Sequence, residues 1–398
     1  MSASSTRRLT SQATGRRAAA AALLIMLVAP AAMAKELTEF YRGVRAMGMG
    51  NAFTAVADDS DAVFYNPAGL AFNQSLAFEF LNPKFDVSQD DYTSIANMKS
   101  TAGGLSGDTI QKFFGKHLYA NGTVFPAVYF PNFVMGFYYS GTFHVVPRNL
   151  ALPNIEATYL IDRGVVSGFG VETRGFKKLH YLRFGVGLKW LTRSGFDGTI
   201  PLTRLATADT GYLRALASDD ATGFAATLGF QYDITLGKQD TFVLASAWQD
   251  AGDVTFGSRT AGNPPPPLRN NLSAGGAFIH RFSSAARAKN NVKLSAEGRH
   301  LLQSGIDPRL RLHAGAEWQL GRLGIQAGVN QTSLTGGFYY DFWLMKLSAV
   351  TYAVDTQSLA MMDRERRYML QLTMRLDLIG IDRRTLKEDD RYRYPRRF

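Results

Sequence analysis

The chain alternates apolar and polar residues over long stretches, and residues 368–378 show this most clearly. Every even position from Tyr368 to Leu378 is apolar or aromatic, whereas Gln371, Thr373 and Arg375 occupy odd positions. A period of two places the apolar residues on one face of a β-strand. The same alternation recurs in residues 182–190, 224–234, 310–318 and 323–329. Strands of about 9–11 residues can cross a bilayer at a tilt, and the mean strand of a soluble protein has only about 5–6.

Fourteen such strands are predicted, beginning near residues 75, 122, 132, 159, 180, 223, 241, 269, 291, 309, 322, 335, 345 and 366. The first connections alternate in length: residues 89–121, 143–158, 194–222 and 251–268 are long, and residues 131–132, 173–179, 235–240 and 283–290 are short. Bacterial membrane barrels join their strands by long extracellular loops and short periplasmic turns, and carry aromatic girdles. The girdle residues here are Trp190, Tyr232, Trp318 and Tyr368. The pattern predicts an all-β fold, a 14-stranded antiparallel transmembrane β-barrel over residues 74–378.

The first 34 residues have the organisation of a secretory signal peptide. Four arginines precede an apolar stretch at 18–28, and Ala32-Met33-Ala34 supplies the small residues of a cleavage site. After residue 34, no uninterrupted apolar run approaches the roughly 20 residues that a membrane-spanning helix needs. Export and a barrel pattern together predict the outer membrane of a Gram-negative bacterium.

Composition narrows the chemistry. The 398 residues include no cysteine, which excludes disulfides and thiolate metal sites. The net charge is +11, but lysine and arginine are scattered along the alternating strands rather than gathered in a basic stripe, so we predict no nucleic-acid partner. The six histidines are also scattered, and no catalytic serine elbow, zinc-protease helix or phosphate loop is present. The sequence therefore predicts no enzyme, no cofactor and no metal site.

Residues 35–73 do not alternate and are rich in glycine and alanine, so we predict that they fill the lumen of the barrel as a hatch. Residues 45–71, which contain Asn66-Pro67-Ala68, resemble the N-terminal hatch of the FadL/TodX family of outer-membrane transport proteins. The resemblance implies a fourteen-stranded barrel that passes hydrophobic small molecules, such as long-chain fatty acids, by passive diffusion. Residues 188–195 and 312–318 also resemble the PorV-like branch, whose members include partners of a secretion system. The alternative function is thus a barrel that docks exported proteins or a secretion apparatus.

The hatch motif also has a physical interpretation. Gly48 and Gly50 permit close backbone approach or positive φ. Asn66 precedes Pro67, which biases it to an extended or turn conformation, and its amide can bond local backbone beside Ala68. We therefore interpret the motif as a structural turn that locks the hatch rather than a ligand contact. Asp58, Asp59 and Asp61 are interpreted as turn or cap residues, with a calcium site as the less favoured alternative.

Three further features are candidates for function. In the first long loop, Ile110, Phe113, Phe114 and Leu118 fall at helical spacing after Asp108, so they could capture hydrophobic ligands or pack on the rim. Arg299, Arg311 and Arg375 are predicted to line the lumen, where an arginine could bind a carboxylate. Residues 379–398 form a charged tail, which we predict to be periplasmic.

The predicted partners are outer-membrane lipid, a hydrophobic small-molecule ligand and, during insertion, the barrel-assembly machinery. The tail adds a candidate periplasmic partner. It also supports a third hypothesis, a structural barrel whose tail anchors the cell wall.

Overall fold

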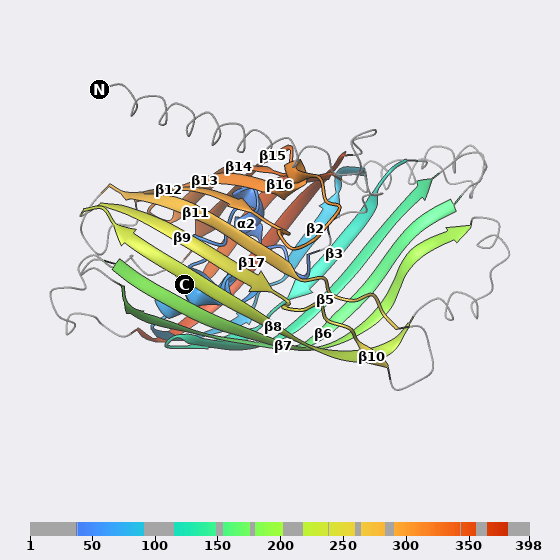
Figure 1. Ribbon diagram of the computed structural model, residues 1–398, viewed down its shortest axis with the longest axis horizontal. Coiled ribbons are helices and arrows are strands. Elements are labelled where there is room, and N and C mark those ends of the chain that lie inside the picture. Colours follow the sequence, from blue (N-terminus) through green and yellow to red (C-terminus); the bar gives the residue numbers. More distant parts are fainter. Residues whose placement is uncertain are drawn as a thin grey trace, which may run out of the picture.

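The computed structural model describes residues 37, 39–90, 115–148, 154–175, 180–201, 218–237, 239–258, 264–282, 290–342, 344–355 and 364–380. Within them the chain forms one antiparallel sheet that curls around three short helices (Figure 1). Its strand segments are β1 (Ser75–Leu81), β2 (Lys84–Ser88), β3 (Leu118–Val124), β4 (Ala127–Phe130), β5 (Phe133–Arg148), β6 (Asn154–Arg174), β7 (His180–Pro201), β8 (Ser218–Thr235), β9 (Asp240–Gln249), β10 (Gly257–Ser258), β11 (Asn271–Arg281), β12 (Asn291–Gly298), β13 (Leu312–Leu320), β14 (Leu323–Asn330), β15 (Ser333–Asp341), β16 (Met345–Asp355) and β17 (Arg364–Gly380).

The sheet closes because its last strand pairs with its first. β17 pairs with β16 on one side and with both β1 and β2 on the other. β1 and β2 form one interrupted strand, β3 and β4 form another, and the two-residue β10 is an appendage that pairs with β8. Fourteen wall strands remain in the described chain, which confirms the predicted fold class.

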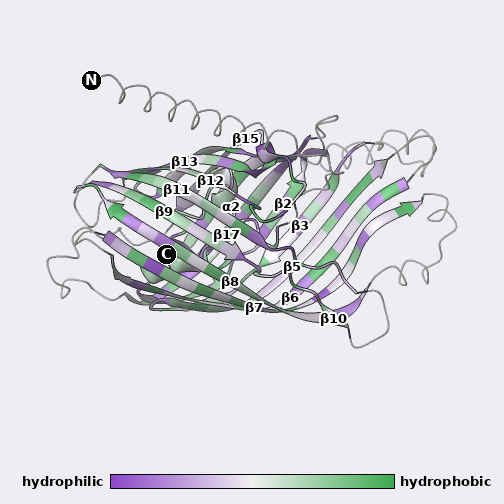
Figure 2. Ribbon diagram, viewed as in Figure 1, coloured by the Kyte–Doolittle hydropathy of each residue, from purple (hydrophilic) through white to green (hydrophobic). Residues whose placement is uncertain are grey.

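The two faces of the wall differ sharply in chemistry. In β13, Trp318 is 48% exposed on the outside, whereas its neighbours Glu317 and Gln319 are buried on the inside. Trp190 and Leu334 are even more exposed, at 69% and 72%. The colours in Figure 2 alternate along the strands accordingly. So large an exposed apolar surface indicates a lipid-facing wall.

The connections define two ends of the barrel. At the end that we call the loop end, β2, β5, β7, β9, β12, β14 and β16 end and β3, β6, β8, β11, β13, β15 and β17 begin. At the opposite, turn end, β4, β6, β8, β11, β13 and β15 end and β5, β7, β9, β12, β14 and β16 begin. β5 to β8 extend further than the rest of the wall at the loop end (Figure 1). The predicted long gap at 143–158 is therefore wrong in extent, because β5 and β6 stay paired out to Arg148 and Asn154. The alternation fades there, although the backbone ladder continues.

The predicted end of the barrel at residue 378 needs a smaller correction. In β17, Ile379 and Gly380 still pair with Leu76 and Ser75 of β1. The predicted signal peptide and residues 381–398 of the predicted tail lie outside the described residues.

The lumen holds residues 39–73, which we call the hatch. The hatch contains α2 (Val44–Gly48), α3 (Ala62–Tyr65) and the 3-10 helix η1 (Pro67–Phe72), and almost all of its side chains are buried. Proline at the first position of η1 suits a helix start, because the missing N–H has no intrahelical acceptor there. The main hydrophobic core forms between the hatch and the inner wall. No helix in the described ranges is long and apolar enough to span a membrane.

A charge on the outer face tests the lipid-facing assignment. Leu244 is 44% exposed and lies near the middle of β9. We expect Leu244→Arg to lower the free energy of unfolding by about 2–4 kcal/mol in bilayers, because the cation would face hydrocarbon. Urea titration in lipid vesicles, followed by the mobility shift of the folded barrel on gels, measures this. Leu244→Val is the matched control, and an equally stable arginine variant would contradict a lipid-facing outer wall.

Candidate functional site

The Asn66-Pro67-Ala68 turn fastens the hatch to itself and to the wall. The side chain of Asn66 accepts a hydrogen bond from the Ala68 amide and donates to the carbonyl oxygens of Thr54 and of Phe230, at 2.9 and 3.1 Å. Phe230 belongs to β8, so one side chain joins two parts of the hatch to the barrel. Asn66 is fully buried. This geometry fits the interpretation of the motif as a structural turn.

Glycines allow the backbone of the hatch to touch the wall. A Cβ on Gly185 of β7 would lie 2.1 Å from the carbonyl carbon of Pro67. At the other side of the hatch, Gly50 has a φ of +63°, and its amide donates to Thr335 of β15 at 3.1 Å. Gly48 ends α2, and its carbonyl accepts from the same Thr335 hydroxyl. Larger residues at Gly185 or Gly50 would meet backbone atoms and push the hatch off the wall, whereas a Cβ on Gly48 would meet only the side chain of Gln326.

An ion cluster joins α2 to the inner wall. Arg45 donates two hydrogen bonds to Glu317 of β13, at 2.5 and 2.8 Å, and also pairs with Asp58 and Asp59 of the hatch. Lys293 of β12 lies 2.5 Å from Asp58. Arg45, Lys293 and Glu317 are all buried. Opposite charges from hatch and wall therefore neutralise one another inside the lumen.

The acidic run of the hatch has two different environments. Burial alone would raise the pKa of Asp58, but the charges of Arg45 and Lys293 outweigh it and hold that pKa well below its usual range. Burial, together with the charge of Asp59, instead raises the pKa of Asp61 to about 6, although Asp61 accepts a hydrogen bond from Tyr41. Cations of the protein already pair with Asp58 and Asp59, and Asp59 also accepts from the Asp61 amide, as a turn residue does. These contacts fit the turn interpretation.

The three candidate arginines of the lumen do not form one site. Arg299 is buried and pairs with Glu39 of the hatch and with Glu297, each at 2.9 Å. Arg311 donates to carbonyl oxygens of the 299–311 connection. Arg375 lies towards the turn end, where it pairs with Asp377 and stacks over Tyr129. Arg299 contacts the hatch through Glu39 and through the carbonyl oxygen of Asn51.

The wall has an interruption at Asn82-Pro83 and Phe125-Pro126, which we call the wall gap. The pairing of β1 with β4 stops at Glu79 and Ala127, and the pairing of β2 with β3 starts only at Lys84 and Thr123. Neither proline has an N–H to donate to a ladder. The carbonyl oxygens of both prolines still accept hydrogen bonds from the strands on either side of the gap. Leu372 of β17 donates to Pro83, and Phe137 of β5 donates to Pro126.

One side chain closes the wall gap. The Asn82 amide donates to the carbonyl of Phe125 at 2.7 Å and accepts from the Phe125 N–H at 2.5 Å. Asn82 thus imitates the two hydrogen bonds of a missing strand residue. Sequence inspection did not find this site, although two X-Pro pairs in adjacent predicted strands were a usable signal.

Behind the wall gap lies an aromatic cluster, formed by Phe40, Tyr41 and Phe64 of the hatch with Phe125 and Tyr138 of the wall. Tyr41 stacks on Phe64 with ring centroids 4.1 Å apart, and Phe64 meets Phe125 edge-on at 5.0 Å. Phe40 lies 4.7 Å from Tyr138. The lumen is rich in ion pairs. The aromatic cluster adds an apolar group of side chains directly beside the wall gap.

Two small cavities border the hatch in the part of the chain that the structure describes. A cavity lined by Phe40, Tyr41 and Phe64 together with polar wall residues holds about 20 Å³, and a second one beside Met47 holds about 10 Å³. A cavity of roughly 10–15 Å³ admits one water, so neither has room for a hydrocarbon.

The predicted capture helix has only one member in the described chain. Ile110, Phe113 and Phe114 lie outside the described residues. Leu118 is the first residue of β3 and pairs with Val145, so the prediction that it belongs to that helix is wrong. β3 therefore begins at Leu118, before the predicted start at residue 122.

The ion cluster should be costly to break. We expect Arg45→Met to lower the free energy of unfolding by about 3–5 kcal/mol, because three carboxylates then share Lys293 in a buried space. Urea titration of the reconstituted barrel measures the loss. Arg163→Met is the matched control: its pair with Asp220 is about half exposed, so the expected loss is at most about 1 kcal/mol. Equal losses in both variants would contradict a fastening role for Arg45.

The structure was compared with those of known proteins, and several other proteins are similar to it. No family model matches the sequence, and no curated protein matches it. Among solved structures, the CymD monoaromatic hydrocarbon channel is 12% identical, with 89% of this chain and 100% of that chain covered and a TM-score of 0.46. The Pseudomonas putida toluene transporter TodX is 12% identical over 86% of this chain and 99% of its own, with a TM-score of 0.42. A Pseudomonas aeruginosa FadL homologue is 9% identical over 87% and 100%, with a TM-score of 0.31. In its hatch motif and its closed fourteen-stranded barrel, the chain is similar to the FadL/TodX family.

Proposed function

We propose that the protein passes hydrophobic small molecules across the outer membrane by passive diffusion through its plugged barrel. The observation that carries this proposal is the aromatic cluster behind the wall gap. Aromatic rings supply an apolar surface with preferred edge and face geometries, which suits hydrocarbons, aromatic compounds and acyl chains. The likeness of the hatch to the FadL/TodX family supports the same substrate class.

The route requires two movements. A ligand that enters from the loop end has to displace part of the hatch, since the present cavities admit no more than water-sized molecules. Polar fastenings suit such a displacement, because water can replace the hydrogen bonds of Asn66 or Thr335 when the hatch shifts. The ligand then leaves sideways through the wall gap into the bilayer, where its apolar surface stays out of water.

Uptake by proteoliposomes tests the function itself. We expect faster uptake of labelled toluene and oleate than in liposomes containing an unrelated closed barrel, and no gain for a disaccharide. No gain for any lipophile would contradict the proposal.

Substitution of Asn82 tests the lateral exit. Removal of the two hydrogen bonds that Asn82 makes across the wall gap, at about 1 kcal/mol each, should raise the population of open wall gaps by about thirtyfold, and with it the uptake of lipophiles. We therefore expect Asn82→Ala to speed uptake of toluene wherever exit limits the rate. Asn121→Ala is the matched control, because its amide bonds β5 where the β3–β5 ladder is intact. If both variants match the unmodified protein, exit does not use the wall gap.

The small size of the two cavities beside the hatch favours the alternative function, a barrel that docks exported proteins or a secretion apparatus. In that case the hatch would be a permanent part of the core. A stable partner in equimolar amount should then purify with the protein from native outer membranes, and no lipophile should enter faster than through the control barrel. Uptake together with the absence of such a partner would exclude docking as the main role.

A further inference from the structure

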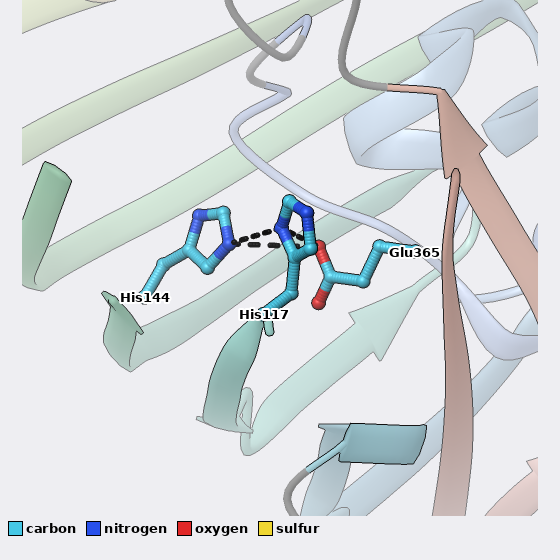
Figure 3. A group of neighbouring side chains, drawn as sticks. All are labelled: His117, His144 and Glu365. Atoms are coloured by element: carbon cyan, nitrogen blue, oxygen red, sulfur yellow. Dashed lines mark hydrogen bonds and ion pairs between the residues drawn. The ribbon is translucent and has the colours of Figure 1, made fainter. Parts of the chain in front are cut away.

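Two histidines and one glutamate meet on the inner wall near the loop end. His117 immediately precedes β3, His144 lies on β5, and Glu365 is the second residue of β17. These strands are neighbours, since β2 links β17 to β3 and β3 pairs with β5. Figure 3 shows the two imidazole rings and the carboxylate pointing toward one another. In the described chain, these side chains form the one group of three potential metal ligands whose donor atoms lie within 4.8 Å of each other.

The spacing of the donor atoms suits a metal ion better than a hydrogen-bonded triad. His117 Nδ1 lies 3.3 Å from His144 Nε2, and each of these atoms lies 3.5 Å from Glu365 Oε2. Hydrogen bonds of good geometry join such atoms at about 2.7–3.2 Å. With metal–ligand bonds of about 2.0–2.2 Å, the ligand atoms of a tetrahedral site are about 3.3–3.5 Å apart. All three distances fall in that interval.

The burial of these side chains and an unsatisfied carboxylate oxygen also favour a bound cation. The side chains of His117 and Glu365 are 3% and 1% exposed, and that of His144 is 16% exposed. Glu365 Oε1 is buried and has no hydrogen-bond partner. A buried carboxylate oxygen without a partner is unfavourable, and a cation would remove that cost.

The surroundings supply a second layer of contacts. Arg367 donates to Glu365 Oε2, the oxygen that faces both imidazoles, at 2.6 Å, which orients the carboxylate. An ion bound by both carboxylate oxygens would also give Oε1 a partner. The backbone amide of His117 donates to Asp90 at 3.1 Å, and its carbonyl accepts from Ser88 at 2.6 Å, so the position of the first ligand is fixed by β2. Tyr119 meets the His144 ring edge-on at 5.7 Å.

We propose that His117, His144 and Glu365 bind a divalent transition-metal ion of the Zn²⁺ class. Two imidazoles and one carboxylate are ligands that zinc commonly has, and the set lacks the six oxygens preferred by calcium or magnesium. Three protein ligands leave a fourth position for water. The ion would join β3, β5 and β17 near the loop end of the wall. This role is independent of the proposed transport, since none of the three residues belongs to the hatch, the wall gap or the aromatic cluster.

Zinc binding by the whole protein tests the proposal. The protein should be purified in detergent without a histidine tag, stripped with a chelator, and titrated with Zn²⁺ against a chromophoric competitor. We expect about one ion per chain, and at least a tenfold loss of affinity in His117→Ala, His144→Ala and Glu365→Gln. His280→Ala is the matched control, because that histidine pairs with Asp240 at the turn end and should leave binding unchanged.

A spectroscopic readout separates a built site from loose surface binding. Co²⁺ in place of Zn²⁺ should give the intense visible absorption of a four-coordinate ion in the unmodified protein, and this absorption should disappear in Glu365→Gln. The gel mobility of the folded barrel shows which variants are folded, and Glu365→Gln keeps the size of the side chain if either alanine variant fails to fold. Stoichiometry far below one ion per chain, or binding that survives the paired substitution of His117 and His144, would overturn the proposal.

Discussion

The pairing of Arg45 with Glu317 joins two parts of the chain that could not otherwise share the lumen. A fourteen-stranded wall encloses more space than its own side chains fill, and its inner face carries charges such as Lys293 and Glu317. Because these charges are buried, each needs a partner of opposite charge. In the hatch, Arg45 pairs with Glu317 and Asp58 pairs with Lys293. The glycines of the inner wall then allow the backbone of the hatch to approach within contact distance. Charge pairing and close packing therefore hold the hatch against the wall of the barrel.

The contacts of the hatch are of two kinds. Its apolar residues share a hydrophobic core with the inner wall, and its polar groups make hydrogen bonds and ion pairs that water could replace if the hatch moved. The aromatic cluster belongs to the apolar contacts, and there Phe64 faces Phe125 at the wall gap. At the wall gap the backbone pairing of the described strands is interrupted, and the side chain of Asn82 bridges it.

The sequence predicted the architecture well because the barrel depends on a local signal. Alternation in residues such as 368–378 requires only that one face meets lipid and the other the lumen, and it predicted the fourteen strands and most of their starts. The exceptions are β3, β6 and β8, which begin before the predicted residues 122, 159 and 223. The signal failed where β5 and β6 continue past it, since a ladder can persist where the outer side chains are no longer apolar. It also assigned Leu118 to a helix, because helical spacing and the start of a strand are alike over a few apolar residues.

The site was less accessible to sequence reasoning because it depends on the closure of the sheet. Asn66 could be interpreted from its own neighbours, and its bonds are those of a turn. The partners of Arg45 and Arg299 could not be predicted, since they lie on strands that only the register of the closed barrel brings to the hatch. The same holds for His117, His144 and Glu365: they belong to or adjoin three different strands, β3, β5 and β17, and no spacing along the chain connects them.

The most direct test of the account is uptake through a barrel whose hatch is reversibly locked. A Cβ on Gly48 would lie 3.0 Å from the Cβ of Gln326 on β14, near the separation of about 3.5–4.5 Å that a disulfide requires, and the chain has no other cysteine. Toluene uptake should be measured in proteoliposomes containing Gly48→Cys with Gln326→Cys, before and after reduction, with each single variant as control. If the hatch has to move, uptake falls to the level of empty liposomes in the oxidised protein and returns on reduction. Equal uptake in the oxidised and reduced states would contradict the account.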